Sequence, residues 1–192
     1  MTIDELYAIA DRFYSVFGVA MWRYQDQYTG FDLTRFEVDK CPNIPNGVSL
    51  KEAVRGRYGD QAVELVETCL ELGSYFKIMQ RIGCTVVESG KVYMGAKNCT
   101  VKYPIRVKFN YDRPIRMDES KAYVMGCLAV RNVVDDVWVL MHLPSGLAAG
   151  NWKAKNAKGA IDKMKLALLI PGIENDMPDS ECIKALKELE TV

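Results

Sequence analysis

The chain has 192 residues, of which 49% are hydrophobic and 26% are charged, and its 25 basic and 25 acidic residues give a net charge of zero. A chain of this length and composition can bury a hydrophobic core without disulfides or metal ions, which excludes a protein that is disordered throughout. No stretch of the sequence is both long and apolar enough to predict a helix that crosses a membrane.

The first predicted element is an amphipathic helix that begins at Ile3 and ends before Gly18. Its apolar residues recur at intervals of three and four, as on the buried face of a helix. Thr2 and Glu5 have the spacing of a capping box, in which each side chain accepts a backbone N–H from the other residue. The sequence therefore predicts a helix that packs into a core.

Two strands are predicted next, at residues 19–26 and 31–39, with Tyr28-Thr29-Gly30 as the turn between them. The following segment, residues 41–47, contains two prolines, two asparagines and a glycine, which is typical of an irregular surface loop. This composition places a candidate boundary near residues 40–48, but the segment before it is too short for an independent domain. We predict a single domain over residues 1–192.

Three helical segments are predicted after this loop. A second capping box, Ser49 with Glu52, begins a short helix, and Asp60 caps the next one. The chain then stays helical, or restarts as a third helix at Ser74, to about Ile82, where Gly83 ends it. The middle helix carries an acidic row on its outer face, formed by Glu64, Glu67 and Glu71. This row fits a surface that recognises a basic partner, and it also fits an ordinary solvated helix face.

From Cys84 to Gly150 the apolar pattern changes to short runs separated by turns, which predicts strands joined in an antiparallel meander. The predicted strands are residues 84–88, 91–96, 101–110, 123–134, 137–143 and a short strand from Leu147, with Ser89-Gly90 as the first hairpin turn. Helices at residues 156–170 and 179–190 follow. The predicted fold class is α+β: an antiparallel meander of about five strands, covered by the N-terminal and C-terminal helices.

The six cysteines are predicted to be reduced and mostly buried. They are Cys41, Cys69, Cys84, Cys99, Cys127 and Cys182, and no two of them form the CxxC pair that zinc sites and thioredoxin-type sites use. The sequence begins Met-Thr-Ile-Asp-Glu, which is acidic where a secretory leader would be basic. Together these features predict a cytoplasmic protein.

Residues 101–109 form the predicted strand with the clearest functional pattern. Val101, Tyr103, Ile105, Val107 and Phe109 alternate with Lys102, Pro104, Arg106 and Lys108. Because successive side chains of a strand point to opposite faces, three cations are expected on one face at intervals of about 7 Å. Such a face fits the binding of phosphates, but lysines and a proline on an edge strand also protect a sheet from association with another sheet.

His142 is the only histidine of the chain and is predicted to lie late in an apolar strand. It could act as a general base for Cys127 or Ser145 as the nucleophile. Asp135 or Asp136 would then orient the imidazole. No local motif forces these groups together, so a hydrogen-bonded structural histidine is the other interpretation.

These observations leave three hypotheses open. The preferred one is a non-enzymatic binding protein that engages nucleic acid, a nucleotide or an acidic protein surface. Its anion-binding residues would be Lys102, Arg106, Lys108, Arg113, Arg116, Lys153 and Lys155. The second hypothesis is a small protein–protein inhibitor of the kind that phages and mobile elements direct against host defence systems. The third is a hydrolase or transferase built on His142.

The sequence contains none of the common signatures of a nucleotide or metal site: it lacks GxGxxG, the P-loop pattern, HExxH and the EF-hand loop. We therefore predict no cofactor, no metal and no membrane partner, and we assign no catalytic residue. A homodimer formed through an exposed edge strand is compatible with the sequence.

Overall fold

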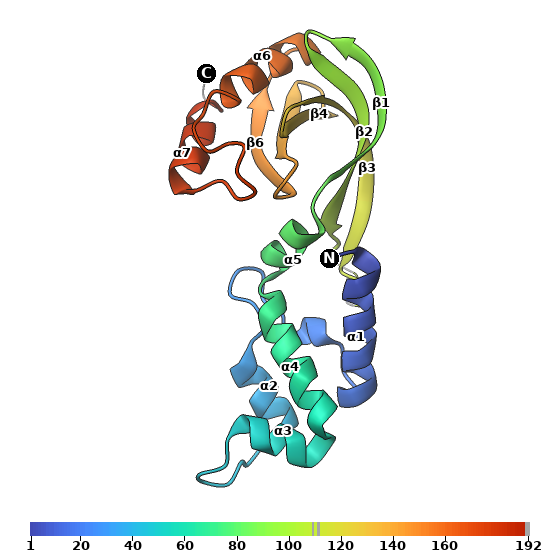
Figure 1. Ribbon diagram of the computed structural model, residues 1–192, viewed down its shortest axis with the longest axis vertical. Helices are drawn as coiled ribbons and strands as arrows, with labels where there is room; N and C mark the ends of the chain where they lie inside the picture. Colours follow the sequence, from blue (N-terminus) through green and yellow to red (C-terminus); the bar gives the residue numbers. More distant parts are fainter. Residues whose placement is uncertain (109, 111, 191–192) are drawn as a thin grey trace. The chain divides into compact units, whose positions relative to one another are not determined.

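The computed structural model describes residues 1–108, 110 and 112–190, apart from the side chains at positions 88, 147, 149 and 150. The chain forms two compact units. Unit 1 contains Met1–Met79 and Arg106–Arg116, and unit 2 contains Gln80–Ile105 and Met117–Val192. The fold class is α+β, as predicted, with helices toward both ends of the chain and one antiparallel sheet (Figure 1).

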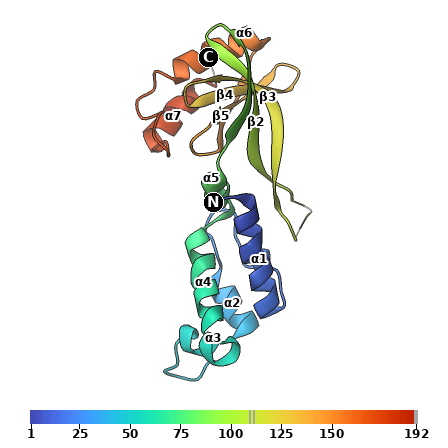
Figure 2. The same cartoon turned by 45° about the vertical axis from the view of Figure 1, so that its right-hand side comes forward.

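Helices make up most of unit 1 (Figure 2). They are α1 (Ile3–Phe17), the 3-10 helix η1 (Met21–Arg23), α2 (Leu33–Lys40), α3 (Leu50–Tyr58), α4 (Asp60–Leu72) and the first part of α5 (Tyr75–Ile82). Both predicted capping boxes are present, and in the first the Thr2 hydroxyl accepts the N–H of Glu5 at 3.1 Å. Asp60 is not a cap, because α4 begins at this residue and Gly59 holds the N-cap position.

The core of unit 1 is a cluster of aromatic rings around Phe13 of α1. The ring of Phe13 has its centroid 4.6–6.1 Å from those of Phe17, Tyr24, Phe31 and Phe36, and all five side chains are buried. Several of these pairs are edge-to-face or tilted, the arrangements that aromatic quadrupoles favour. The apolar face of α1 is therefore core, as its spacing predicts.

The two strands predicted at residues 19–26 and 31–39 are wrong. The first segment contains η1 and the second forms α2, and the described residues keep a single antiparallel bridge, Gln25 with Phe31. The Asp32 carboxylate accepts the backbone N–H of Arg35 at 2.9 Å and so caps the start of α2. This local cap, together with burial of Phe36 in the aromatic core, outweighs the strand-like alternation of the sequence.

Unit 2 contains the sheet, a six-stranded meander in the order β1-β2-β3-β4-β5-β6 (Figure 1). Its strands are β1 (Thr85–Tyr93), β2 (Ala96–Arg106), β3 (Ile115–Met125), β4 (Leu128–Val134), β5 (Val137–His142) and β6 (Leu147–Lys153). Helices α6 (Ala157–Ala167) and α7 (Ser180–Glu188) lie where the sequence predicts helices and contact β4 and β6. Leu128, Leu140 and Trp152 of the sheet pack with Ile161 and Met164 of α6 in one buried cluster.

Ser89-Gly90 is not the first hairpin turn, because β1 runs through both residues and the chain turns at Met94-Gly95. The two turn residues have φ values of 54° and 87°, and positive φ at both positions is what a two-residue type I′ hairpin turn requires. Gly90 serves a different purpose. A Cβ at this position would lie 2.6 Å from the carbonyl oxygen of Asn98, so the glycine permits a β-bulge in which the two backbones approach closely.

The strand predicted at residues 123–134 is two strands. β3 ends at Met125 and β4 begins at Leu128, and Gly126, whose φ is 57°, makes the turn between them. Most of β3 was not predicted. It contains the adjacent acidic residues Asp118 and Glu119, which are half-buried and exposed, respectively, and such a pair is more typical of a turn than of a strand.

Strand β2 contains most of the predicted strand at residues 101–109 but ends at Arg106. Lys108 therefore lies beyond the strand, and Phe109 lies outside the described residues. β2 has β1 on one side and β3 on the other. The edge-protection interpretation is therefore wrong for Lys102, which pairs with Thr85 of β1, but it stays a prediction for Pro104 and Arg106, to which the described pairing with β1 does not extend.

The burial pattern of β2 agrees in part with the predicted alternation. Val101 and Tyr103 are buried, as predicted, but Pro104, which was expected on the outward face, is buried as well. The described pairing of β1 with β2 reaches Lys102. A homodimer through an edge strand stays a prediction, and it would involve β1 or β6 rather than β2.

The prediction of a single domain also stays a prediction. The loop near residues 40–48, which was the candidate boundary, lies inside unit 1. The chain instead passes between the units after Met79, after Ile105 and after Arg116. The β2–β3 hairpin is therefore divided, with most of both strands in unit 2 and its end, residues 106–116, in unit 1. We call residues 106–116 the hairpin tip.

Candidate functional site

The structure divides the seven predicted anion-binding residues between the two units. Four of them, Arg106, Lys108, Arg113 and Arg116, belong to the hairpin tip and are exposed. The other three, Lys102, Lys153 and Lys155, belong to unit 2 and are also exposed. The candidate site is therefore the hairpin tip, which brings four of the seven predicted cations together in one compact unit.

The three cations of unit 2 have separate surroundings. The Lys102 ammonium lies 3.9 Å from the carboxylate of Glu119 on the neighbouring strand β3. Lys153 is the last residue of β6, and Lys155 lies in the short segment before α6. An opposite charge beside Lys102 lowers its attraction for a further anion, so this residue is a weaker candidate than its position in the sequence suggests.

Local hydrogen bonds join the described residues of the hairpin tip. The N–H of Val107 donates to the carbonyl of Pro114 at 2.6 Å, which closes the loop between the two strands. The side-chain oxygen of Asn110 accepts the N–H groups of Asp112 and Arg113 at 3.2 and 2.9 Å. Asparagine favours turns because its side chain can satisfy backbone donors in this way.

Two aromatic side chains of the helices hold the tip. The Tyr7 hydroxyl of α1 accepts the N–H of Ile115 at 3.0 Å and donates to the carbonyl of the same residue. The indole N–H of Trp22 donates to the carbonyl of Asp112 at 3.0 Å. Burial raises the pKa of Tyr7, partly opposed by its hydrogen bond with Ile115 and by the charge of Arg113. The hydroxyl is thus neutral at physiological pH and keeps its proton for the bond.

The two arginines of the tip that flank its turn lie on aromatic faces. The guanidinium carbon of Arg106 is 4.2 Å from the ring centroid of Tyr75, and that of Arg113 is 4.7 Å from the ring centroid of Tyr7. Tyr75 is itself stacked on Trp22, with 5.6 Å between centroids and an interplanar angle of 21°. These cation–π contacts hold both guanidinium groups against a buried aromatic layer.

The four cations of the tip have no carboxylate within ion-pairing distance among the described residues. The tip has four basic residues and one acidic residue, Asp112, and therefore a formal charge of +3. Residues 1–79, which form the rest of unit 1, contain 8 basic and 12 acidic residues. The tip is thus a basic segment on an acidic unit.

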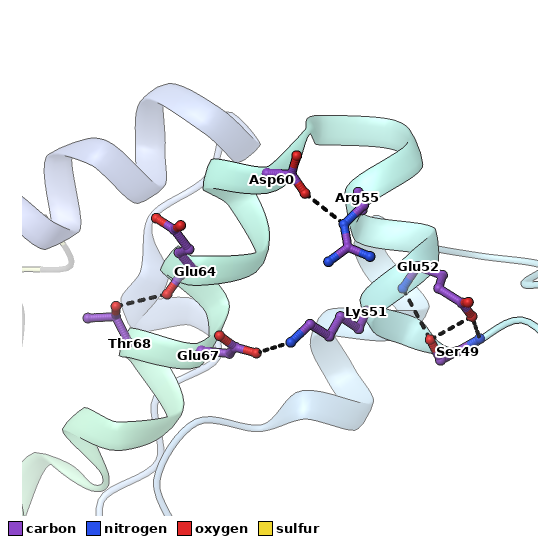
Figure 3. A network of polar contacts seen from close by, with 8 residues as sticks. All are labelled: Ser49, Lys51, Glu52, Arg55, Asp60, Glu64, Glu67 and Thr68. Atoms are coloured by element: carbon purple, nitrogen blue, oxygen red, sulfur yellow. Dashed lines mark hydrogen bonds and ion pairs between the residues drawn. The ribbon is translucent and has the colours of Figure 1, made fainter.

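The predicted acidic row on α4 has a different environment (Figure 3). Glu67 accepts a hydrogen bond from the Lys51 ammonium at 2.7 Å, and Asp60 at the start of the helix pairs with Arg55 at the same distance. Both basic partners come from α3. These pairs join the two helices and reduce the net charge of the surface, which supports the interpretation of the acidic row as a solvated helix face.

His142 is buried and both of its ring nitrogens have partners. A carbonyl can only accept, so Nε2–H donates to the carbonyl of Ile173 at 2.8 Å. Nδ1 is then unprotonated and accepts from the hydroxyl of Ser145, 2.7 Å away and also buried. Burial lowers the pKa of His142, and the hydrogen bond with Ile173 opposes this shift. Asp135 and Asp136 lie in the β4–β5 turn, at the opposite end of β5 from His142.

The Cys127 thiol joins the same group, because its S–H donates to the Ile173 carbonyl at 3.3 Å. Burial raises the pKa of this thiol and so disfavours the thiolate that a nucleophile needs. His142 and Cys127 thus both donate to one backbone carbonyl in the segment between α6 and α7, and Ser145 donates to the other ring nitrogen of His142. This geometry supports a structural role for His142, which is to anchor that segment to the sheet. All six cysteines are free, as predicted.

Sequence reasoning missed the aromatic layer under the tip. Tyr7 was interpreted as a core residue of a helix, Trp22 was placed in a predicted strand, and Tyr75 was not singled out. Arg106 lies 31 positions from Tyr75 in the sequence, and Arg113 lies 106 positions from Tyr7. No local pattern could therefore pair them. An alternation rule reports which face a side chain occupies, and it carries no information about such long-range contacts.

No protein-family model, no curated protein and no solved structure matches the chain. Among the described residues, no helix is long and apolar enough to cross a membrane. Within the same part of the chain, no cluster of three or more His, Cys, Asp or Glu side chains is placed to hold a metal ion. The function has to be inferred from the geometry of the residues themselves.

Proposed function

We propose that this chain is a non-enzymatic binding protein whose hairpin tip engages an anionic partner, and that the partner class it matches best is the phosphate backbone of a nucleic acid. One observation carries the proposal. The guanidinium groups of Arg106 and Arg113 lie over the rings of Tyr75 and Tyr7, while no described carboxylate neutralises them.

A stacked guanidinium is well suited to phosphate. Its N–H donors lie in the plane of the group, so stacking through the face leaves the edge available for a fork-shaped contact with two oxygens. Stacking also removes much of the side-chain freedom that an anion would otherwise have to restrict. Lys108 and Arg116 add two exposed charges on the same tip. Long-range attraction would therefore favour a partner with several phosphates over a single nucleotide.

The test is the salt dependence of binding to labelled oligonucleotides, measured by fluorescence anisotropy on the full chain. We expect the logarithm of the association constant to fall linearly with the logarithm of salt concentration. The double variant Lys108→Glu with Arg116→Glu should lower the affinity and reduce this slope by about one to two units. Neither side chain makes a hydrogen bond or ion pair with a described residue, so the fold should be unaffected.

The matched control is Lys153→Glu with Lys155→Glu, which reverses two exposed cations of unit 2. This variant should bind as the unchanged chain does if the tip is the site. Equal losses in both double variants would point to attraction by overall charge, and unchanged binding by the tip variant would refute the proposal. Tight binding to polyglutamate with no binding to oligonucleotides would indicate an acidic protein surface as the partner.

A further inference from the structure

The most exposed aromatic side chain among the described residues lies next to the hairpin tip, within unit 1. It is Tyr28, which is 76% exposed and lies in the loop between Gln25 and Phe31. A single exposed ring is ordinary on a protein surface, so it is the contacts around Tyr28 that mark it as a candidate binding residue.

The loop that carries Tyr28 is fixed by its own hydrogen bonds. The carboxylate of Asp26 accepts the N–H groups of Tyr28 and Thr29 at 2.8 and 2.9 Å. These hydrogen bonds lower the pKa of Asp26 to about 2, and the bond from the N–H of Thr29 has the largest effect. The carbonyl of Asp26 in turn accepts the N–H of Tyr75, at 3.2 Å, and so ties the loop to the start of α5. Tyr28 is therefore presented by a defined turn.

Gln27 connects this ring to the tip. Its side-chain oxygen accepts a hydrogen bond from Nη1 of Arg106 at 3.0 Å, and its side-chain nitrogen donates to the Tyr28 hydroxyl at 3.1 Å. Arg106 itself lies on the ring of Tyr75. One amide thus places an exposed ring beside a stacked arginine, with the exposed Lys108 two residues further along the chain.

We propose that this surface binds single-stranded nucleic acid, with one unpaired base stacked on Tyr28 and the neighbouring phosphates on Arg106 and Lys108. An unpaired base presents its face to a side chain, whereas the bases of a duplex are stacked on one another and cannot. Alternating ring and cation is the arrangement by which proteins bind single strands without reading their sequence. This inference rests on the proposed function and narrows its partner class.

The experiment compares a labelled oligothymidylate of about 12 nucleotides with a duplex of the same length, on the full chain, by fluorescence anisotropy. We expect tighter binding to the single strand. Tyr28→Ala should lower that affinity by about 5- to 150-fold, the effect of losing one base–aromatic stack, and should leave duplex affinity and the salt slope unchanged. Tyr28→Phe keeps the ring and should retain the affinity.

Tyr14→Ala is the matched control, because Tyr14 is 60% exposed on α1 and its side chain makes no described contact with Gln27 or Arg106. It should bind both probes as the unchanged chain does. Single-strand binding that survives Tyr28→Ala, or a preference for the duplex, would overturn this inference while the reversal of Lys108 and Arg116 still tests the proposed function. If that reversal leaves binding intact, the proposed function fails first, so the two failures are distinguishable.

Discussion

Unit 1 carries two charged surfaces that are built in opposite ways. On the face of α3 and α4, Lys51 pairs with Glu67 and Arg55 pairs with Asp60, each at 2.7 Å. On the hairpin tip, Arg106 and Arg113 contact aromatic rings, and no described carboxylate lies close enough to pair with them. On the α3–α4 face the charged side chains pair with each other. On the tip the cations have no described carboxylate partner and are open to an anion of another molecule.

The comparison shows why a count of charges in the sequence is a poor guide to a binding surface. The acidic row of α4 and the basic residues near β2 both form conspicuous clusters in the sequence. They differ in whether the fold places opposite charges beside them. Ion pairs on a surface cancel most of the electrostatic potential that its unpaired charges would produce. An aromatic platform orders a cation without neutralising it.

The largest loss of stability is expected when a buried ring that contacts the tip is removed. Tyr75→Ala removes a side chain that is 3% exposed and stacks on both Trp22 and Arg106. Loss of a large buried ring should lower the free energy of unfolding by about 3–5 kcal/mol, measured by urea denaturation. Phe76→Ala, at the next position but 41% exposed, is the control and should cost far less. Similar losses in the two variants would contradict the role given to the aromatic layer.

A smaller loss is expected when only the hydrogen bonds to the tip are removed. Tyr7→Phe keeps the ring under Arg113 but leaves the N–H and carbonyl of Ile115, a residue that is 1% exposed, without their partner. Unsatisfied buried groups of this kind cost about 1–3 kcal/mol in unfolding free energy. Limited proteolysis should then cut the tip faster. The same change at the exposed Tyr14 should alter neither measurement.

Because His142 is the only histidine, a change of pH between 7.5 and 5.5 leaves the formal charges of both surfaces nearly constant while it titrates this one group. Burial lowers the pKa of His142 in the folded protein below its ordinary value of 6.5. The unfolded chain therefore binds the proton first, so stability is complete above about pH 6.5 and falls below it, by at most about 1.4 kcal/mol per pH unit. His142→Gln should flatten this dependence in denaturation curves, and an unchanged slope would show that another group is responsible.

The smallest loss of stability is expected on the face of α3 and α4, where the charged side chains form ion pairs. Lys51→Ala removes an exposed ion pair with Glu67, and such pairs contribute about 0.2–1 kcal/mol at low salt. The loss should disappear in high salt, because exposed charges are screened there. A loss comparable with that of Tyr7→Phe would mean that the α3–α4 face matters more to unit 1 than its solvent exposure suggests.

The parts of the fold that the sequence predicts well are those with local causes. Helix α1 and the start of α3 have capping boxes that can be recognised from four consecutive residues, and both are present. Strand β5 has a short apolar run bounded by turns, and it lies where it was predicted. In these cases the sequence pattern and the interactions that form the element involve the same few neighbouring residues.

The errors arise where a distant contact decides between two local possibilities. Residues 31–39 alternate like a strand, yet Phe36 belongs to the aromatic core and Asp32 caps a helix. Ser89-Gly90 has the composition of a hairpin turn, yet Gly90 is needed where the backbone of Asn98 approaches. For the candidate site, the cations could be named from the sequence, but their aromatic platforms and the division of β2 between two units could not.

That division has a practical consequence for dissecting the protein. The tip lies in the middle of the sequence of unit 2, so no single cut of the chain releases unit 1 whole. A fragment ending at Met79 would lack the peptide that bonds to Tyr7 and Trp22 and would expose the ring faces that Arg106 and Arg113 contact. Unit 1 is thus suited to fragment complementation: residues 1–79 supply the receptor, and a synthetic peptide of residues 106–116 supplies the missing piece in trans.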